Sequence, residues 1–245
     1  MIGEPDFGEQ AISKVAEVGI SSQLDDVENL DVDIRTNPIQ MMQGKVDSVT
    51  IAGEGAVMKE DLRVESFELR TGTIAINPGG VLFGKIELTQ PADANAKFVL
   101  HEDDLNRAFS SDFLRDKLQN LEIQADGKTV PFDITNAKID LLDEQRLELE
   151  ADVLLKETNE THHFKTIAKP KVQAQGQRIG LEILSTEAEG LSPELTDALC
   201  STMMEFLDLR NFSLEGMSLT LQQLKMDADR LTLHTTTTIE EFPSA

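Results

Sequence analysis

Residues 30–35 have the sequence Leu30-Asp31-Val32-Asp33-Ile34-Arg35, in which apolar and charged side chains alternate strictly. A period of two is typical of a β-strand that buries one face, because successive side chains point to opposite sides of the backbone. The same alternation recurs along the chain, at Ile74 and Ile76, Ile86 and Leu88, Phe98 and Leu100, Leu147 and Leu149, Leu181 and Ile183, and Leu231 and Leu233. The continuous apolar runs of buried parallel strands are missing. The sequence therefore predicts long antiparallel strands.

Three segments with apolar residues at helical spacing interrupt these strands. The first runs from about Asp6 to Val18. The second begins near Glu102 and continues after Ser110-Ser111 to Leu118. The third begins at Ser192-Pro193-Glu194, which supplies a capping side chain, a first-turn proline and an acid near the positive end of the helix dipole. Helices and strands together predict an α+β fold.

No Pro-, Gly- or Ser-rich linker divides the 245 residues, which predicts a single domain over residues 1–245. The openings of the second and third helices are similar, Glu102-Asp103-Asp104-Leu105 beside Ser192-Pro193-Glu194-Leu195. This similarity predicts two related halves, over about residues 20–119 and 120–210. The chain is 40% hydrophobic and long enough to bury a sizeable core without disulfides.

The net charge restricts the partners. With 45 acidic against 22 basic residues, the formal charge is −23, which repels nucleic-acid phosphates and anionic membrane surfaces. We therefore expect no nucleic-acid partner. Trp and Tyr, which anchor proteins at bilayer interfaces, are absent, so any membrane contact should be weak and peripheral. The segment from Met1 to Phe7 lacks the features of a signal peptide, and no stretch has the ~20 apolar residues that span a bilayer, which predicts a cytoplasmic location.

An internal repeat relates two connectors between strands. Asn37-Pro38-Ile39-Gln40-Met41-Met42-Gln43-Gly44-Lys45-Val46 matches Asn77-Pro78-Gly79-Gly80-Val81-Leu82-Phe83-Gly84-Lys85-Ile86. Asn can cap, Pro suits the first helical position, and Gly can end a short helical turn, so one interpretation is a capped connector. The functional interpretation is an apolar rim at one end of the sheet, where a membrane or ligand enters. This rim would consist of Ile39, Met41, Met42, Val81, Leu82 and Phe83.

The chain resembles the cyanobacterial branch of the LmeA-like phospholipid-binding family, formerly a domain of unknown function. The resemblance rests on these connectors, on the strands around them and on the segment Leu100-His101-Glu102-Asp103-Asp104-Leu105-Asn106-Arg107-Ala108-Phe109. The resemblance extends over roughly Glu9 to Glu240 and concerns the overall pattern rather than a catalytic signature. It implies a long curved antiparallel sheet wrapped on helices, as in tubular lipid-binding proteins, and non-enzymatic lipid binding. The chain differs from the actinobacterial members in lacking an export signal, and no site motif carries over residue by residue.

Motifs with catalytic potential are incomplete. Asp31-Val32-Asp33 resembles a metal-binding Asp-X-Asp, but its alternation with apolar residues predicts the wet face of a strand. Gly53-Glu54-Gly55 lacks the third glycine and the helix of a dinucleotide loop. His162 and His163 are adjacent and would point to opposite faces of a strand, while Cys200 lies beside the apolar stripe of the third helix, as expected for an inert thiol. We therefore expect no catalytic residue, metal site or cofactor.

One segment stands out against the acidic background. Residues 161–181 contain no Asp or Glu but include Lys165, Lys169, Lys171 and Arg178. The structural interpretation is a hairpin whose lysines pair with acids on neighbouring strands. The functional interpretation is contact with an anionic head group or an acidic protein partner.

Two functional hypotheses follow. In the first, the protein binds, and potentially transfers, phospholipid or another apolar small molecule in a groove of the curved sheet. Abundant Leu, Ile and Met with few aromatic residues suit such a deformable pocket. In the second, it is a protein-interaction scaffold with a self-filled core and no ligand. The residue types that line a core and a lipid groove are the same, so the sequence leaves both hypotheses open.

Overall fold

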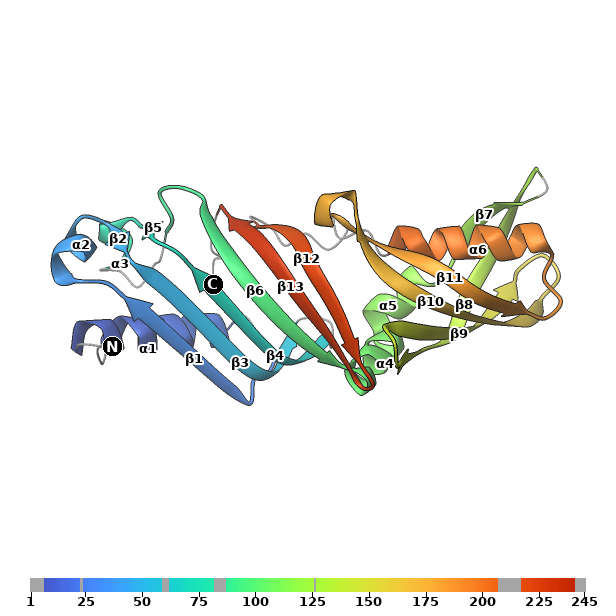
Figure 1. Ribbon diagram of the computed structural model, residues 1–245, viewed down its shortest axis with the longest axis horizontal. Coiled ribbons are helices and arrows are strands. Elements are labelled where there is room, and N and C mark those ends of the chain that lie inside the picture. The colour runs from blue at the N-terminus through green and yellow to red at the C-terminus, as the bar shows by residue number, and fades with distance from the viewer. Residues whose placement is uncertain are drawn as a thin grey trace.

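The structure is a computed structural model that describes residues 7–22, 24–58, 62–81, 87–125, 127–206 and 217–240. The molecule is elongated, and two curved antiparallel sheets follow one another along its long axis (Figure 1). The predicted α+β fold with a curved antiparallel sheet is confirmed, although the strands form two large sheets rather than one.

Six strands form the first sheet, in the order β1-β3-β4-β6-β13-β12. Their bounds are β1 (Asn29–Arg35), β3 (Ser48–Met58), β4 (Leu62–Thr71), β6 (Ala92–His101), β12 (Met217–Asp227) and β13 (Arg230–Ile239). The C-terminal hairpin therefore returns to pair with β6, and the second sheet is inserted in the chain between β6 and β12.

Five strands form the second sheet, in the order β11-β10-β9-β8-β7. Their bounds are β7 (Leu121–Ala125), β8 (Lys128–Leu142), β9 (Arg146–Leu155), β10 (Glu160–Gln173) and β11 (Arg178–Ala188). Every strand here pairs with its neighbour in sequence, which is the predicted meander. The first sheet departs from a meander only where the C-terminal hairpin joins it.

Short elements complete the described fold. A two-stranded sheet pairs β2 (Lys45–Val46) with β5 (Ile74–Ala75). The helices are α1 (Phe7–Ser21), α2 (Pro38–Met42), α3 (Pro78–Val81), α4 (Glu102–Ser110), α5 (Asp112–Lys117) and α6 (Pro193–Phe206), together with the 3-10 turn η1 (Ala174–Gly176). The predicted first and third helices correspond to α1 and α6. The Ser192 hydroxyl accepts a hydrogen bond from Leu195 N at 3.2 Å, as expected for a cap.

The prediction of one continuous helix from Glu102 to Leu118 is wrong. Ser111 has an extended backbone (φ −66°, ψ 151°), which ends α4 and begins α5. Its hydroxyl accepts a hydrogen bond from Leu114 N at 3.4 Å and donates one to the carbonyl of Ala108 at 2.7 Å. Serine commonly caps helix termini in this way instead of continuing a helix.

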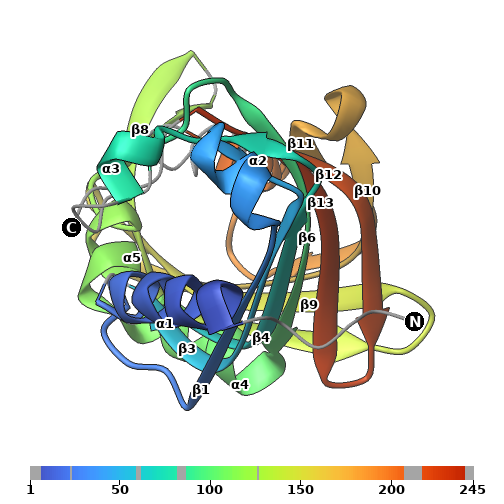
Figure 2. The ribbon, with the colours of Figure 1, turned by 90° about the vertical axis from the view of Figure 1, so that its left-hand side faces the viewer.

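The apolar face of the first sheet is concave, and α1 lies inside its curve (Figure 2). Ser13 and Glu9 of α1 accept hydrogen bonds from the backbone N–H groups of Ile34 and Thr36, at 3.1 and 2.8 Å. Helix α1 therefore also protects the free edge of β1. The buried core beneath it comprises Ala16, Val32, Ile34, Val46, Val49, Ile51, Ile74, Ile76 and Ala92.

Two further cores lie in the second half. Leu199 of helix α6 packs over the second sheet in a core with Ile123, Phe132, Val153, Leu155 and Phe164. The other core joins the two sheets, because Met226 of β12 packs against Leu141, Leu147, Ala168 and Leu181.

Helix α4 bridges the two sheets through polar side chains. Strand β7 pairs only with residues 128–132 of β8, so the far part of β8 lacks a strand partner on that side. There the Asn106 amide donates to the carbonyl of Ile139 and accepts from its N–H, both at 2.8 Å, and Glu102 accepts from Leu141 N at 2.7 Å. On its other side, the buried carboxylate of Asp104 pairs with Arg63 of β4 at 2.9 Å. Helix α4 thus substitutes for a neighbouring strand.

Backbone groups on the outer edge of β12 find hydrogen-bond partners in the second half of the molecule. The Gln145 amide donates to the carbonyl of Met226 at 2.5 Å and accepts from its N–H at 3.0 Å. Turn η1 also lies against this strand, because a Cβ placed on Gly176, whose φ is +88°, would lie 2.4 Å from the carbonyl oxygen of Leu221. These contacts hold the second half against the first sheet.

We expect Asn106→Ala to lower the free energy of unfolding by about 1–3 kcal/mol, because both backbone groups of Ile139 lose their partner. Urea denaturation followed by circular dichroism measures this. Asn95→Ala is the control, since Asn95 is exposed on β6 and makes no side-chain hydrogen bond with the described part of the chain. Equal effects of the two substitutions would contradict the role of Asn106.

We also expect Gly176→Ala to destabilise the protein more than Gly127→Ala. Both glycines have a positive φ, +88° and +72°, so both substitutions carry a similar backbone strain. A Cβ at Gly127 meets nothing within 4 Å, whereas one at Gly176 collides with β12. The collision should add about 1–3 kcal/mol, measured as the difference between the two urea midpoints. Identical midpoints would exclude close packing of η1 on β12.

Candidate functional site

Three rows across the middle of the concave face of the first sheet contain no charged residue. Residues paired directly across strands share a face, so the register assigns side chains to it. One row crosses all six strands through Leu30, Gly53, Phe67, Phe98, Leu233 and Leu224. The next two rows contain Val32, Ile51, Leu69, Ala96, Thr235 and Leu221, and Ile34, Val49, Thr71, Ala94, Thr237 and Leu219. A molecule on these three rows would meet only the side chains of apolar residues and threonine hydroxyls.

Part of this face is incompletely covered. Phe98, Leu100, Leu219 and Leu233 are half-buried and lie outside the core clusters formed by the described residues. On one side of them the sheet packs under α1, and on the other it packs against the second sheet. In the register, Leu221 and Thr235 lie between Leu219 and Leu233 and are only 2% and 3% exposed, so Leu219 is separate from the other three residues. We call the four half-buried residues the apolar strip.

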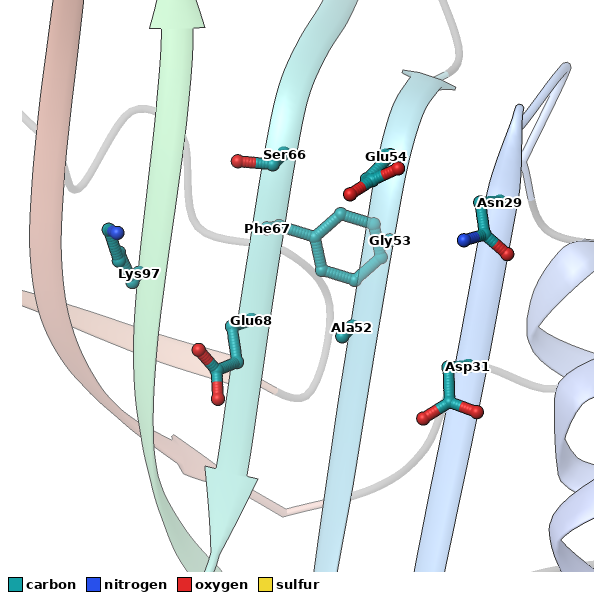
Figure 3. A pocket seen from close by; sticks show the side chains of 9 residues that line it. All are labelled: Asn29, Asp31, Ala52, Gly53, Glu54, Ser66, Phe67, Glu68 and Lys97. Atoms are coloured by element: carbon teal, nitrogen blue, oxygen red, sulfur yellow. The ribbon is translucent and has the colours of Figure 1, made fainter.

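The side chain of Phe67 points away from the apolar strip. Its ring lies beside Gly53 on β3, although its other cross-strand partner is Phe98 on β6 (Figure 3). A Cβ at Gly53 would lie 2.3 Å from Cε1 of Phe67, so glycine is what allows the ring to take this place. The ring therefore does not cover Phe98.

Two shallow polar hollows are lined mostly by residues whose side chains belong to the opposite face of the sheet. One has a volume of about 220 Å³ and is lined by Asn29, Asp31, Ala52, Gly53, Glu54, Ser66, Phe67, Glu68 and Lys97 (Figure 3). The other, of about 310 Å³, is lined by Asp93, Ala94, Asn95, Ser218, Thr220, Thr236, Thr237 and Thr238. Within the described part of the chain, no group of three or more His, Cys, Asp or Glu residues could hold a metal ion.

The two Asn-Pro connectors are capped helical turns. The Asn37 side chain accepts a hydrogen bond from Gln40 N at 2.9 Å, and the Asn77 side chain accepts one from Gly79 N at 3.0 Å. Gly44 follows α2 with a φ of +71°. The structural interpretation of the repeat is therefore confirmed for the Asn caps of both connectors and for Gly44 in the first, while Gly84 of the second lies outside the described residues.

The connectors also lie at the same end of the first sheet. Strands β2 and β5 pair with each other, and the carbonyl of Gly44 accepts a hydrogen bond from Ile76 N at 2.8 Å (Figure 1). Ile39 and Met42 of α2 are 71% and 83% exposed, and Met41 is half-buried. The side chain of Val81 and the whole of Leu82 and Phe83 lie outside the described residues. The functional role of this rim stays a prediction.

The basic residues of segment 161–181 lie on the β10–β11 hairpin and its connection. Lys165 donates to Glu148 and Glu150 at 2.6 and 2.9 Å, and these hydrogen bonds raise the pKa of Lys165. Lys171 pairs with Glu182 on β11, and this hydrogen bond lowers the pKa of the Glu182 carboxyl. Arg178 donates to the side-chain oxygen of Gln173 at 3.1 Å. This pairing is what the structural interpretation predicts, and head-group contact through Lys165, Lys169, Lys171 and Arg178 stays a prediction.

The residues considered for catalysis are dispersed. Asp31 is exposed on β1, and Asp33 pairs with Arg35 at 2.8 Å. His163 lies 3.2 Å from the carboxylate of Asp152 on one face of the second sheet, and His162 lies 3.1 Å from the carbonyl of Glu189. Cys200 is half-buried in α6, and burial raises the pKa of its thiol. These positions agree with the structural interpretations made from the sequence.

Sequence reasoning did not single out the apolar strip. Its residues have the same alternating pattern as fully buried strand residues, and the signal available, period two, identifies a face but not what covers it. Their pairing across β6, β12 and β13 joins segments more than a hundred residues apart in the chain.

Comparison with known proteins gives a family. No described helix is long and apolar enough to cross a membrane. No curated protein matches the chain. A family described as LmeA-like phospholipid-binding matches residues 4–236, while the cyanobacterial branch of that family stays a prediction. Because this match extends over nearly the whole chain of curved antiparallel sheets, the protein belongs to the LmeA-like phospholipid-binding family.

Proposed function

We propose that the protein binds phospholipid without catalysis, by accommodating acyl chains along the concave face of the first sheet. The apolar strip carries this proposal, because Phe98, Leu100, Leu219 and Leu233 are half-buried between two packed cores. An acyl chain on the strip would bury apolar surface on both partners, at about 0.8 kcal/mol per buried CH₂.

The charge distribution suggests how the lipid is oriented. The described positions of the concave rows have no cation that could pair with a phosphate. Burying an unpaired phosphate there would be costly, so the head group stays in solvent or at the surface. Transfer of lipid between membranes, with the chains shielded on this face, is part of the same proposal. Lys165, Lys169, Lys171 and Arg178 remain proposed head-group contacts, although their polar partners compete for this role.

The alternative is a protein-interaction scaffold whose core is filled by its own side chains. The three core clusters favour this hypothesis for most of the fold, because their side chains pack against one another. The two proposals therefore differ only at the apolar strip, and bound lipid decides between them.

We expect protein purified without detergent to carry phospholipid, and Phe98→Gln to carry about 10-fold less, since its amide would lose water without gaining a partner. Native mass spectrometry, with quantification of extracted lipid, measures this. Lys97→Gln is the matched control, because Lys97 is the exposed neighbour on the opposite face of β6. Circular dichroism confirms that both variants are folded.

Wild-type protein that carries no lipid and extracts none from phosphatidylcholine vesicles would favour the scaffold. Equal lipid content in the two variants would place the lipid elsewhere on the molecule.

The absence of catalysis is tested at the thiol and the histidines. Burial raises the pKa of the Cys200 thiol, so little of it is present as the reactive thiolate at neutral pH. Alkylation of Cys200 should therefore become fast only at a pH above the pKa of a free cysteine. We expect iodoacetamide to modify Cys200 more slowly than free cysteine at neutral pH, as measured by intact mass. We also expect incubated phospholipid to stay intact with wild type. Turnover that is lost in Cys200→Ser or His163→Ala would refute the non-enzymatic proposal.

A further inference from the structure

Helix α2 presents two large apolar side chains to solvent. Ile39 and Met42 are 71% and 83% exposed, the highest values for large hydrophobic residues in the described part of the chain. They are three residues apart, so they project from the same side of a helix. Adjacent exposed apolar side chains at the end of an elongated molecule are typical of a contact surface.

The base of α2 is tied to the rest of the fold by hydrogen bonds and packing. Asn37 caps the helix, Thr36 donates its hydroxyl to the carbonyl of Lys45 at 2.9 Å, and β2 pairs with β5. Beneath these contacts Val46 and Ile74 are each 3% exposed. Ile39 and Met42 therefore extend into solvent from a packed support.

Charge determines which surface this end can meet. The net charge is −23, and next to α2 the exposed Lys45 is offset by the exposed Asp47. An anionic bilayer would therefore repel the protein as a whole, with no local excess of positive charge at α2. A bilayer of net-neutral head groups imposes no such repulsion.

The orientation of the molecule supports contact through this end. Helix α2 lies at one end of the long axis, and the strands of the first sheet extend away from it (Figure 1). The ten residues of β4 span about 33 Å, whereas charges are screened beyond about 8–10 Å at physiological ionic strength. At physiological ionic strength most of the acidic surface therefore lies beyond the screening length of a membrane at this end. At about 0.01 M salt, where the screening length is about 30 Å, its acidic side chains interact with the charge of the bilayer.

We propose that the protein docks end-on to bilayers of net-neutral phospholipid by inserting Ile39 and Met42, and that its acidic surface discriminates against anionic bilayers. This inference rests on the proposed binding of phospholipid, for which it supplies the membrane contact. Insertion of the two apolar side chains provides the attraction to the membrane. Long-range repulsion between the acidic surface and anionic lipids provides the selectivity for net-neutral bilayers.

Flotation of the full chain with vesicles tests the docking end. We expect wild type to bind phosphatidylcholine vesicles and the Ile39→Ser/Met42→Ser variant to bind at least about 10-fold more weakly. Val18→Ser is the matched control, because Val18 is 66% exposed but lies on α1, toward the end away from the contact of Glu9 with Thr36. All substituted side chains are exposed, so the fold should persist, and thermal unfolding verifies this.

Salt dependence tests the selectivity. Vesicles of equimolar phosphatidylcholine and phosphatidylglycerol should bind less protein than phosphatidylcholine alone at low salt. Raising the salt from about 0.01 M to about 1 M shortens the screening length from about 30 to about 3 Å, and should increase binding to the mixed vesicles. Binding to phosphatidylcholine should change little. Most peripheral proteins that use basic patches show the opposite trend.

The inference is overturned if binding to mixed vesicles falls with salt, if the double variant binds like wild type, or if Val18→Ser weakens binding equally. Lipid content measured on the same preparations separates this inference from the proposed function. Lipid-loaded wild type that does not bind phosphatidylcholine vesicles refutes docking and leaves lipid binding intact. Protein that docks through α2 but carries no lipid supports docking and refutes the acyl-chain proposal.

Discussion

The joint between the two sheets depends on pairing the free backbone groups of two strand edges. Strand β8 extends beyond β7, and β12 ends the first sheet, so both would leave backbone donors and acceptors without partners. Asn106 and Glu102 of α4 satisfy one edge, and Gln145 satisfies the other. Because an amide side chain donates and accepts at once, it can replace a strand residue at a single position. The elongated arrangement of two sheets rests on these few contacts and on the core around Met226.

This arrangement explains why the apolar strip is located where it is. The core under α1 and the core at the joint each bury one part of the concave face, and the half-buried residues lie between them. A compact sandwich would have covered the same residues with a second sheet. Here the second sheet follows the first along the long axis, so it covers only the adjoining end (Figure 1).

Charge is separated from apolar surface across the middle of the first sheet. Charged side chains such as Asp31, Glu68 and Lys97 occupy the convex face, where pairs such as Arg35 with Asp33, 2.8 Å apart, contribute little to stability. The concave rows contain no charged residue at the described positions. A strongly acidic protein can therefore belong to a phospholipid-binding family, because its charge and its uncharged face are on opposite sides of the same strands.

The sequence by itself determined the strands, their buried faces and the capped connectors, because period-two alternation and Asn-Pro caps are local signals. The sequence-based prediction was wrong at Ser111, where the structure breaks the expected helix into α4 and α5. A serine can either continue a helix or cap it, and the packing of neighbouring segments determines which occurs. Only the tertiary structure decided that the strands divide into two sheets, that β13 returns to β6, and that both connectors share one end. It also decided which apolar residues stay partly open, since burial depends on pairing between distant segments. Alternation specifies that a side chain faces inward, but not whether anything lies opposite it.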